Sequence, residues 1–420
     1  MLLRRVLLVC AVLVGPMADA GAQTRAQVMA QAIPLVTRAD PTAIRGPLTE
    51  GYVAQPIIMA RAARAFWSAE AMINLEGLTL DRGELSTGAY GEGYVDRRHP
   101  HAYVHELLLG LEGSRGPFSA SMFLGRGFAP FGSDDPMVRP MVKYPVNHHL
   151  AQILERLVAV VAIRRGPIIG EFGVFAGDEP LAPGSPPQLN RFADSWSGRL
   201  TVLPTDVMEL SASLADVTSP ELPQGHGLDQ RKTSLVARYA ATIGTTATYA
   251  LAEWEATSER DRGRRVATLR SALAEGAACR GPLMLAARIE RTDRAEEEPL
   301  LDPFRVARPS SDLNSLGISR WLTATASVTL SPWRGKASPF AEVARVSVSP
   351  GDPPGIFDPE LRYGARTMWM YSVGMRLRAG QRHDRMGRYG VAAPSSKMGT
   401  MAHGTGSESM MTHSTHSCPF

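Results

Sequence analysis

The chain consists largely of short segments in which apolar and polar residues alternate, and these segments are separated by turn-forming residues. Leu322, Ala324 and Ala326, for example, interleave with Thr323 and Thr325. A repeat of two residues places the two sets of side chains on opposite faces of a β-strand. The recurrence of this pattern along the chain predicts an all-β architecture, either a sandwich or a barrel.

We count about fourteen such segments, which is an even number. The predicted strands lie near residues 66–79, 102–112, 117–126, 153–164, 167–177, 192–203, 206–216, 230–242, 245–256, 265–278, 282–293, 319–331, 339–349 and 367–379.

The connections between the predicted strands alternate between short and long. Arg165-Gly166-Pro167 and Ile243-Gly244-Thr245 are tight turns, whereas 127–152 and 294–318 are long. Outer-membrane barrels sort their connections in this way, because their periplasmic turns are short and their outer loops are long. We therefore predict an up-and-down antiparallel transmembrane β-barrel of about 14 strands, within a range of 12–16, over residues 64–379.

The N-terminus has the features of a cleaved signal peptide. Arg4-Arg5 precedes an apolar run from Val6 to Val14, and Ala20-Gly21-Ala22 is a small-residue cleavage site. We predict that residues 1–22 are removed and that the protein is exported to the cell outer membrane. With an even number of strands both chain ends lie in the periplasm, so we assign residues 23–63 as a periplasmic N-terminal segment and 380–420 as a disordered periplasmic tail.

Charge and motifs argue against nucleic-acid binding and against catalysis. The 45 Lys and Arg residues nearly balance 41 Asp and Glu residues, and the net charge of +4 is dispersed. His105-Glu106 lacks the second histidine of a zinc-protease helix, and neither Gly-x-Ser-x-Gly nor Cys-x-x-Cys occurs. We therefore expect no enzyme, although a barrel hydrolase that needs only a Ser and a His remains an alternative.

Two stretches carry a resemblance to a known family. Gly125-Arg126-Gly127-Phe128-Ala129-Pro130-Phe131-Gly132 ends a predicted strand, Glu155-Arg156 follows downstream, and Phe175-Ala176-Gly177-Asp178 ends another strand. These stretches resemble phosphate-selective and related Gram-negative porins, in which an asparagine usually stands where Ala176 does. The resemblance implies a pore-forming barrel with one loop folded toward the lumen, but the solute selectivity of that family does not carry over.

Charged residues on such a loop and on the inward strand faces would meet water and a permeating ion. The alternative for the loop is an ordinary structured outer loop held by its prolines. His148 and His149 are further loop candidates, but as strand neighbours they would point to opposite faces and make a poor metal pair. The pore-lining candidates are Arg126, Asp134, Asp135, Arg139, Lys143, Arg288, Glu290, Arg376 and Arg378.

The C-terminal tail is rich in sulfur and imidazole ligands, which together suit Cu(I) better than hard cations. It is similar to the Met/His-rich segments of periplasmic copper-handling proteins, including outer-membrane copper-resistance barrels. The alternative is a low-complexity extension without metal. The candidate ligands are Met398, Met401, His403, Met410, Met411, His413, His416 and Cys418.

The sequence as a whole predicts a porin-like channel for passive diffusion of small hydrophilic solutes across the outer membrane. Two alternatives remain: an outer-membrane protein of copper handling or resistance, and a non-conducting barrel that acts as a scaffold or adhesin. The expected partners are outer-membrane lipid and small hydrophilic solutes, with a homo-oligomer left open.

Overall fold

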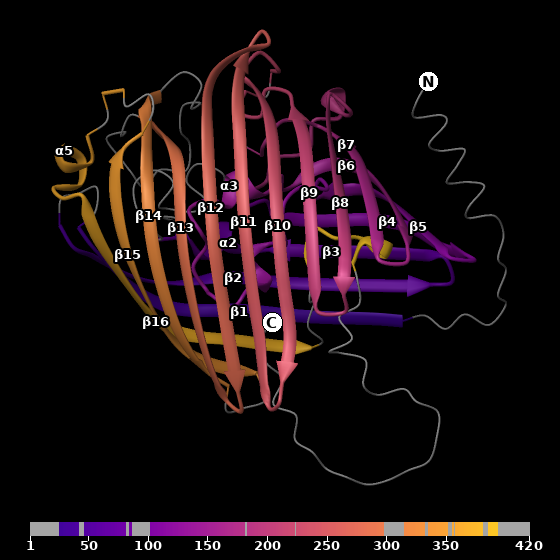
Figure 1. The fold of residues 1–420 in the computed structure, drawn as a ribbon, viewed down its shortest axis with the longest axis horizontal. Helices are drawn as coiled ribbons and strands as arrows, with labels where there is room; N and C mark the ends of the chain where they lie inside the picture. Colours follow the sequence, from indigo (N-terminus) through magenta and orange to yellow (C-terminus); the bar gives the residue numbers. More distant parts are fainter. Residues whose placement is uncertain are drawn as a thin grey trace.

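The computed structural model of the protein describes residues 25–41, 46–80, 84–85, 101–180, 183–222, 224–297, 315–331, 335–351, 355–356, 358–380 and 385–393. These residues form a closed barrel of sixteen antiparallel strands (Figure 1). The strands are β1 (Arg25–Asp40), β2 (Leu48–Arg64), β3 (Trp67–Asn74), β4 (Val104–Arg115), β5 (Phe118–Gly127), β6 (Arg156–Arg165), β7 (Ile168–Phe175), β8 (Ser195–Thr205), β9 (Met208–Val217), β10 (Asp229–Ile243), β11 (Thr246–Asp261), β12 (Arg264–Arg280), β13 (Leu283–Glu297), β14 (Ser315–Leu330), β15 (Ala337–Pro350) and β16 (Thr367–Gly380). The short helices are α2 (Glu76–Thr79), α3 (His148–Ala151) and α5 (Pro359–Tyr363), with 3-10 turns at Pro136–Val138, Leu189–Arg191 and Gly390–Ala392.

Every strand pairs with its neighbours in sequence, and the first strand pairs with the last. The closing ladder of β1 and β16 runs from Met29 opposite Gly380 to Asp40 opposite Trp369. Closure leaves no strand with an unpaired edge, which is the condition for strands to cross hydrocarbon.

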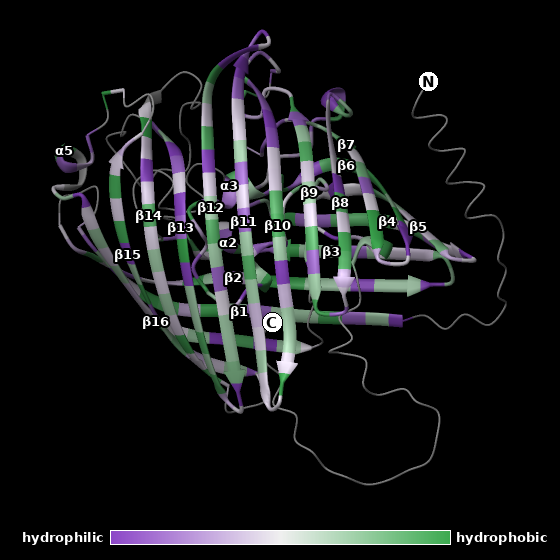
Figure 2. Ribbon diagram, viewed as in Figure 1, coloured by the Kyte–Doolittle hydropathy of each residue, from purple (hydrophilic) through white to green (hydrophobic). Residues whose placement is uncertain are grey.

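The two faces of the wall have opposite polarity, as the alternating colours along the strands in Figure 2 show. On β10, Leu235 points outward and is 51% exposed, whereas the neighbouring Ser234 points inward and is fully buried. On β14, Leu322 is likewise exposed beside the buried Thr323. An apolar outer face and a polar interior are the reverse of a water-soluble barrel and suit a barrel surrounded by lipid. No helix among the described residues is both long enough and apolar enough to cross a membrane.

The short turns gather at one end of the barrel. Two-residue turns join β4 to β5, β6 to β7, β8 to β9, β10 to β11 and β12 to β13. The long connections after β3, β5, β7, β9, β13 and β15 leave from the opposite end. The connection between β11 and β12, at that same opposite end, is a two-residue turn, because β11 and β12 extend further than the predicted strands 245–256 and 265–278. With sixteen strands, β1 starts and β16 finishes at the end with the short turns.

The fourteen predicted segments correspond to β3 through β16, so the all-β closed barrel is confirmed with two strands more than expected. The assignment of residues 23–63 to a periplasmic segment is wrong, because residues 25–40 and 48–64 form β1 and β2. Their alternation is weak: Pro34 and Pro56 interrupt it, and inward positions such as Ile33 and Leu35 are apolar. These side chains pack against other apolar groups inside the barrel, not against water.

The fold leads to a first prediction. Protein refolded in detergent should give a β-dominated circular dichroism spectrum, and in cells it should fractionate with outer membranes, because the wall is a closed sheet in which every strand pairs with two neighbours. A helix-dominated spectrum or recovery in the soluble periplasm would contradict the barrel.

Candidate functional site in the barrel lumen

The connection between β5 and β6, residues 128–155, folds into the barrel, and we call it the lumenal loop. It leaves the wall after Gly127 and returns at Arg156, two residues that lie opposite each other in the β5–β6 ladder. Most of its residues are buried even though the loop is a connection rather than a core element. The loop is therefore anchored at one point of the wall and extends inward from it.

The loop reaches strands on the far side of the barrel. The guanidinium of Arg139 contacts the carboxylate of Glu253 on β11 at 2.6 Å. The backbone N–H groups of Val142 and Lys143 donate to the two carboxylate oxygens of Glu342 on β15, at 3.1 and 3.2 Å. Because β11 and β15 lie on the other side of the strand order from β5 and β6, the loop crosses the bore.

Two inward-facing arginines of the far wall also bind the backbone of the lumenal loop. Arg288 on β13 donates to the carbonyl oxygen of Lys143 at 3.0 Å, and Arg376 on β16 donates to that of Pro140 at 3.4 Å. Backbone carbonyls and amides thus pair with charged side chains of the wall, which satisfies loop groups that have no ladder partner.

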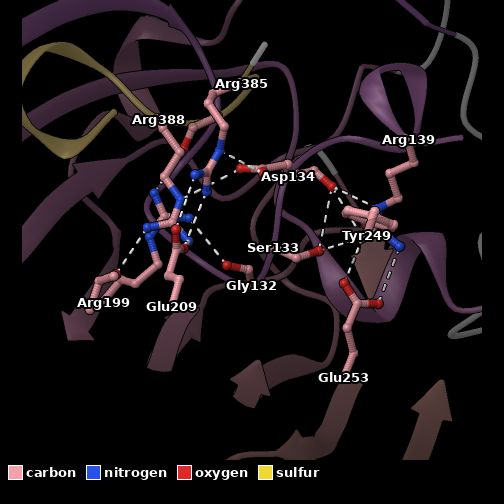
Figure 3. A network of polar contacts seen from close by, with 12 residues as sticks. Gly132, Ser133, Asp134, Arg139, Arg199, Glu209, Tyr249, Glu253, Arg385 and Arg388 are labelled. Atoms are coloured by element: carbon pink, nitrogen blue, oxygen red, sulfur yellow. Dashed lines mark hydrogen bonds and ion pairs between the residues drawn. The ribbon is translucent and has the colours of Figure 1, made fainter. Parts of the chain in front are cut away.

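A second segment enters the lumen from the end with the short turns. Residues 385–393, here the C-terminal segment, follow β16 and lie against the inner face of β4–β9. Arg385 contacts Asp134 of the lumenal loop at 2.7 Å and Glu209 of β9 at 3.0 Å. Arg388 contacts Glu209 at 2.7 Å (Figure 3). The prediction that residues 380–420 form a disordered tail is therefore wrong for 385–393, because these two arginines pair with buried carboxylates.

The charges of this network are stable at neutral pH. Burial by itself would lower the pKa of Arg385, but the carboxylates of Asp134 and Glu209 raise it above its ordinary value. Burial and the nearby positive charge of Arg199 together lower the pKa of Arg388 to about 10. Both guanidinium groups remain charged at pH 7, so the ion pairs persist there.

An aromatic residue fastens the C-terminal segment to the base of the loop. The hydroxyl of Tyr389 donates to Glu106 at 2.8 Å and accepts from the backbone N–H of Phe128 at 2.8 Å. Burial and the neighbouring Glu106 carboxylate raise the pKa of Tyr389, so the hydroxyl keeps its proton. Met386 and Tyr389 also belong to an apolar cluster with Phe123 and Phe128.

The lumenal loop and the C-terminal segment meet inside the barrel. A polar cavity between them has a volume of about 10 Å³, roughly the space of one water molecule. It is lined by Ser133, Asp134, Arg139, Glu209, Arg385 and Arg388, among other residues. The two lumenal segments therefore contact each other and the wall around this cavity.

Buried histidines gather beside the base of the lumenal loop. His101 precedes β4, His105 lies on β4, and their rings stack with centroids 5.2 Å apart. The Nδ1 atom of His105 is 2.5 Å from Glu155 Oε1, and that of His101 is 3.2 Å from Glu76 Oε2. Burial lowers the pKa of His101, so its imidazole is neutral at pH 7. We call His101, His105 and Glu155 the histidine cluster.

Sequence reasoning considered His105 only as part of a zinc-protease helix and did not find this cluster. The spacing His101-x-x-x-His105 is visible in the sequence. The third member of the cluster, Glu155, lies 50 residues from His105, so the spacing alone does not identify the cluster.

The predicted pore-lining residues lie inside the barrel or near one of its ends. Arg378 is half-buried near the end with the short turns and donates to Gln31 at 2.7 Å. His148 and His149 begin α3, so they occupy a helical turn and not a strand. The candidates that are buried inside the barrel are Arg126, Asp134, Asp135, Arg139, Lys143, Arg288, Glu290 and Arg376.

Two predictions fall on residues outside those that the structure describes. One is the signal peptide of residues 1–22. The other is the tail ligand set of Met398, Met401, His403, Met410, Met411, His413, His416 and Cys418.

Comparison with known proteins gives matches in structure but not in sequence. No protein-family model matches the chain, and no curated protein matches it. Among solved structures, an anion-selective porin from Comamonas acidovorans has a TM-score of 0.51 at 11% identity, over 85% of this chain and 100% of the porin. OmpT with loop L8 deleted, an outer membrane protein of Vibrio cholerae, gives 0.49 at 8% identity over 85% and 99%. OccK3 (OpdO) of Pseudomonas aeruginosa gives 0.45 at 11% over 85% and 96%. The likeness to the first of these shows the fold: the chain has a porin-type fold, a closed antiparallel barrel of sixteen strands.

Proposed function

We propose that the protein is an outer-membrane channel for passive diffusion of small hydrophilic solutes, with a bore narrowed from inside. The observation that carries the proposal is the lumenal loop, which crosses a polar interior and contacts β11 and β15 on the far side. A loop in this position confronts any solute that enters the barrel. A scaffold or adhesin would need its long connections on the outside and gives no reason for this inward fold.

Positive and negative charges balance inside the barrel, so they favour the passage of both cations and anions and not of anions alone. Arg199 contacts Glu171 at 2.6 Å, and Arg288 contacts Glu275 at 2.9 Å, so wall arginines are compensated by carboxylates. The name of the Comamonas porin states anion selectivity, and we do not extend that property to this chain. Transport, not catalysis, is the activity we assign. Copper binding by the tail and assembly into a homo-oligomer stay predictions.

Planar bilayers test this function. Wild-type protein should give stepwise conductance of small amplitude, because the lumenal loop crosses the bore and the C-terminal segment also lies inside it. In a salt gradient the reversal potential should lie close to zero, since the wall arginines Arg199 and Arg288 are compensated by Glu171 and Glu275. The absence of steps at any voltage would favour the scaffold or adhesin alternative, and a strong anion preference would contradict the charge argument.

A further inference from the structure

We propose that the outer face of β12–β15 is a binding surface for the phosphate groups of lipid headgroups in the outer leaflet. The surface is built from Arg270 on β12, Arg291 on β13 and Arg345 on β15, and we call it the arginine patch. This inference goes beyond the proposed channel function, because it requires only that the barrel spans the outer membrane and does not depend on conduction.

The three arginines point away from the lumen. All three are exposed, and the residues beside them, such as Glu290 and Ala344, are buried inside the barrel. Since successive side chains of a strand point to opposite faces, the arginines belong to the lipid-facing set. A solute in the bore therefore does not meet them.

The arginines lie close together on strands that are side by side in Figure 1. Arg291 lies opposite Ala272, which is two residues from Arg270 on the same face of β12. Arg345 lies opposite Ala324 of β14, two residues from the partner of Arg291. Because neighbouring strands are about 4.8 Å apart, the patch is about 15 Å wide.

The arginine patch lies at the height where the hydrocarbon is expected to end on the side of the long connections. Arg291 is eight residues from Leu283, where β13 starts, and Arg345 is eight residues from Ala337, where β15 starts. A strand needs about 9–11 residues to cross a membrane. The uncharged lipid-facing band of β13 therefore ends at Arg291. Its members are Leu283, Leu285, Ala287 and Ile289.

Exposed tryptophans mark the same height. Trp254 of β11 lies opposite Ala272 of β12, in the same row of the sheet as Arg291. Trp369 of β16 lies opposite Arg345. Outer-membrane barrels carry girdles of aromatic residues at both membrane–water interfaces, and their long loops are extracellular. These tryptophans and the arginine patch beside them therefore lie at the headgroups of the outer leaflet.

The positive charge of the arginine patch is not compensated by the wall. Among the residues of β12–β15 whose side chains the structure describes, Asp293 is the only carboxylate on the lipid-facing side, and Arg320 pairs with it at 2.9 Å. The carboxylates that are buried in the lumen are Glu275, Glu290, Glu296 and Glu342. A guanidinium group presents a planar set of donors that matches the oxygens of a phosphate. Lipid phosphates are therefore suitable partners for the patch.

A second protein with an acidic surface would also match this charge. The arginine patch, however, is continuous with the uncharged band and the tryptophans, which form the surface that a barrel presents to lipid. Lipid that covers this surface brings its headgroup to the arginines. We therefore assign the patch to lipid and not to a protein partner.

Native mass spectrometry of the refolded full-length protein tests the arginine patch. The probe is lipid A, a glycolipid with two phosphate groups, added to the protein in detergent. The wild-type protein should retain this lipid. Arg270→Gln with Arg291→Gln and Arg345→Gln should weaken retention about tenfold or more, because charge-assisted contacts to phosphate are lost.

The matched control removes the same charge at the opposite end of the wall. Arg64, Arg115 and Arg280 are exposed beside short turns on β2, β4 and β12. Replacing all three by Gln should leave lipid A retention unchanged, because no aromatic row or shared patch joins them. Equal retention by the patch variant and this control variant would overturn the proposal.

A second comparison uses only the wild-type protein, so it does not depend on the folding of a variant. Lipid A without its phosphate groups should be retained about tenfold less than the phosphorylated form, because the acyl chains are the same and only the phosphates differ. Equal retention of the two lipids would show that apolar contacts alone hold the lipid. Loss of subunits instead of lipid from the patch variant would assign the patch to a contact between protein copies. Either result contradicts a phosphate-binding surface.

Discussion

Replacing residues 130–151 of the lumenal loop by Gly-Ser-Gly should raise single-channel conductance by about threefold or more, because barrels of sixteen strands enclose an aqueous channel when nothing fills them. The barrel should survive this change, since Gly127 and Arg156 are paired neighbours that a short loop can join. The replacement removes Arg139, Val142 and Lys143, the residues that contact the far wall. Conductance steps in planar bilayers give the readout.

The matched control removes α5, Pro359–Tyr363, from the β15–β16 connection. This helix lies on a loop at the same end of the barrel, and its Leu361 is 68% exposed. Its loss should leave the step size unchanged. Equal conductance of the wild-type and loop-replaced barrels would show that the lumenal loop does not limit the bore, and the proposed function would lose its main support.

Reversing two charges of the C-terminal segment, Arg385→Glu with Arg388→Glu, should expel this segment from the lumen. Both arginines are at most 9% exposed, and they face Asp134 and Glu209. Breaking a buried ion pair by changing one partner costs about 3–5 kcal/mol, and the introduced carboxylates add like-charge repulsion. We therefore expect larger conductance steps and new protease cleavage within residues 385–393, measured by mass spectrometry.

The control for this experiment makes the same charge change elsewhere. Arg115 and Arg280 are exposed residues beside short turns, at the end of the barrel where the C-terminal segment enters. Arg115→Glu with Arg280→Glu should alter neither conductance nor cleavage. If the Arg385 and Arg388 variant behaved like this control, the segment would be held by its apolar contacts around Tyr389 and not by its charges.

Strand identity was largely predictable because membrane strands separate polar from apolar residues by face. Leu322 and Thr323 point to lipid and lumen respectively, and the pattern survives wherever the inner face meets water. It fails for β1 and β2, where Ile33 and Leu35 point inward yet are apolar. Their partners include Val142 of the lumenal loop, so the local pattern depends on a segment more than a hundred residues away.

The candidate site was likewise predictable from the sequence only in part. Arg139, Lys143 and Asp134 were predicted to face the lumen, because charged side chains on a loop folded into a porin-like barrel reach water there. Their partners Glu253, Glu342 and Arg385 lie on distant strands or after the last strand, and no local spacing identifies them.

The sequence by itself determined the all-β class, the alternation of short and long connections and the polarity of most of the wall, because these properties depend on neighbours within about ten residues. Tertiary structure alone decided the count of sixteen strands, since closure requires β1 to pair with β16. It also decided the packing of residues 385–393 in the lumen and the meeting of His101, His105 and Glu155. These contacts join residues far apart in sequence, so only the path of the folded chain brings them together.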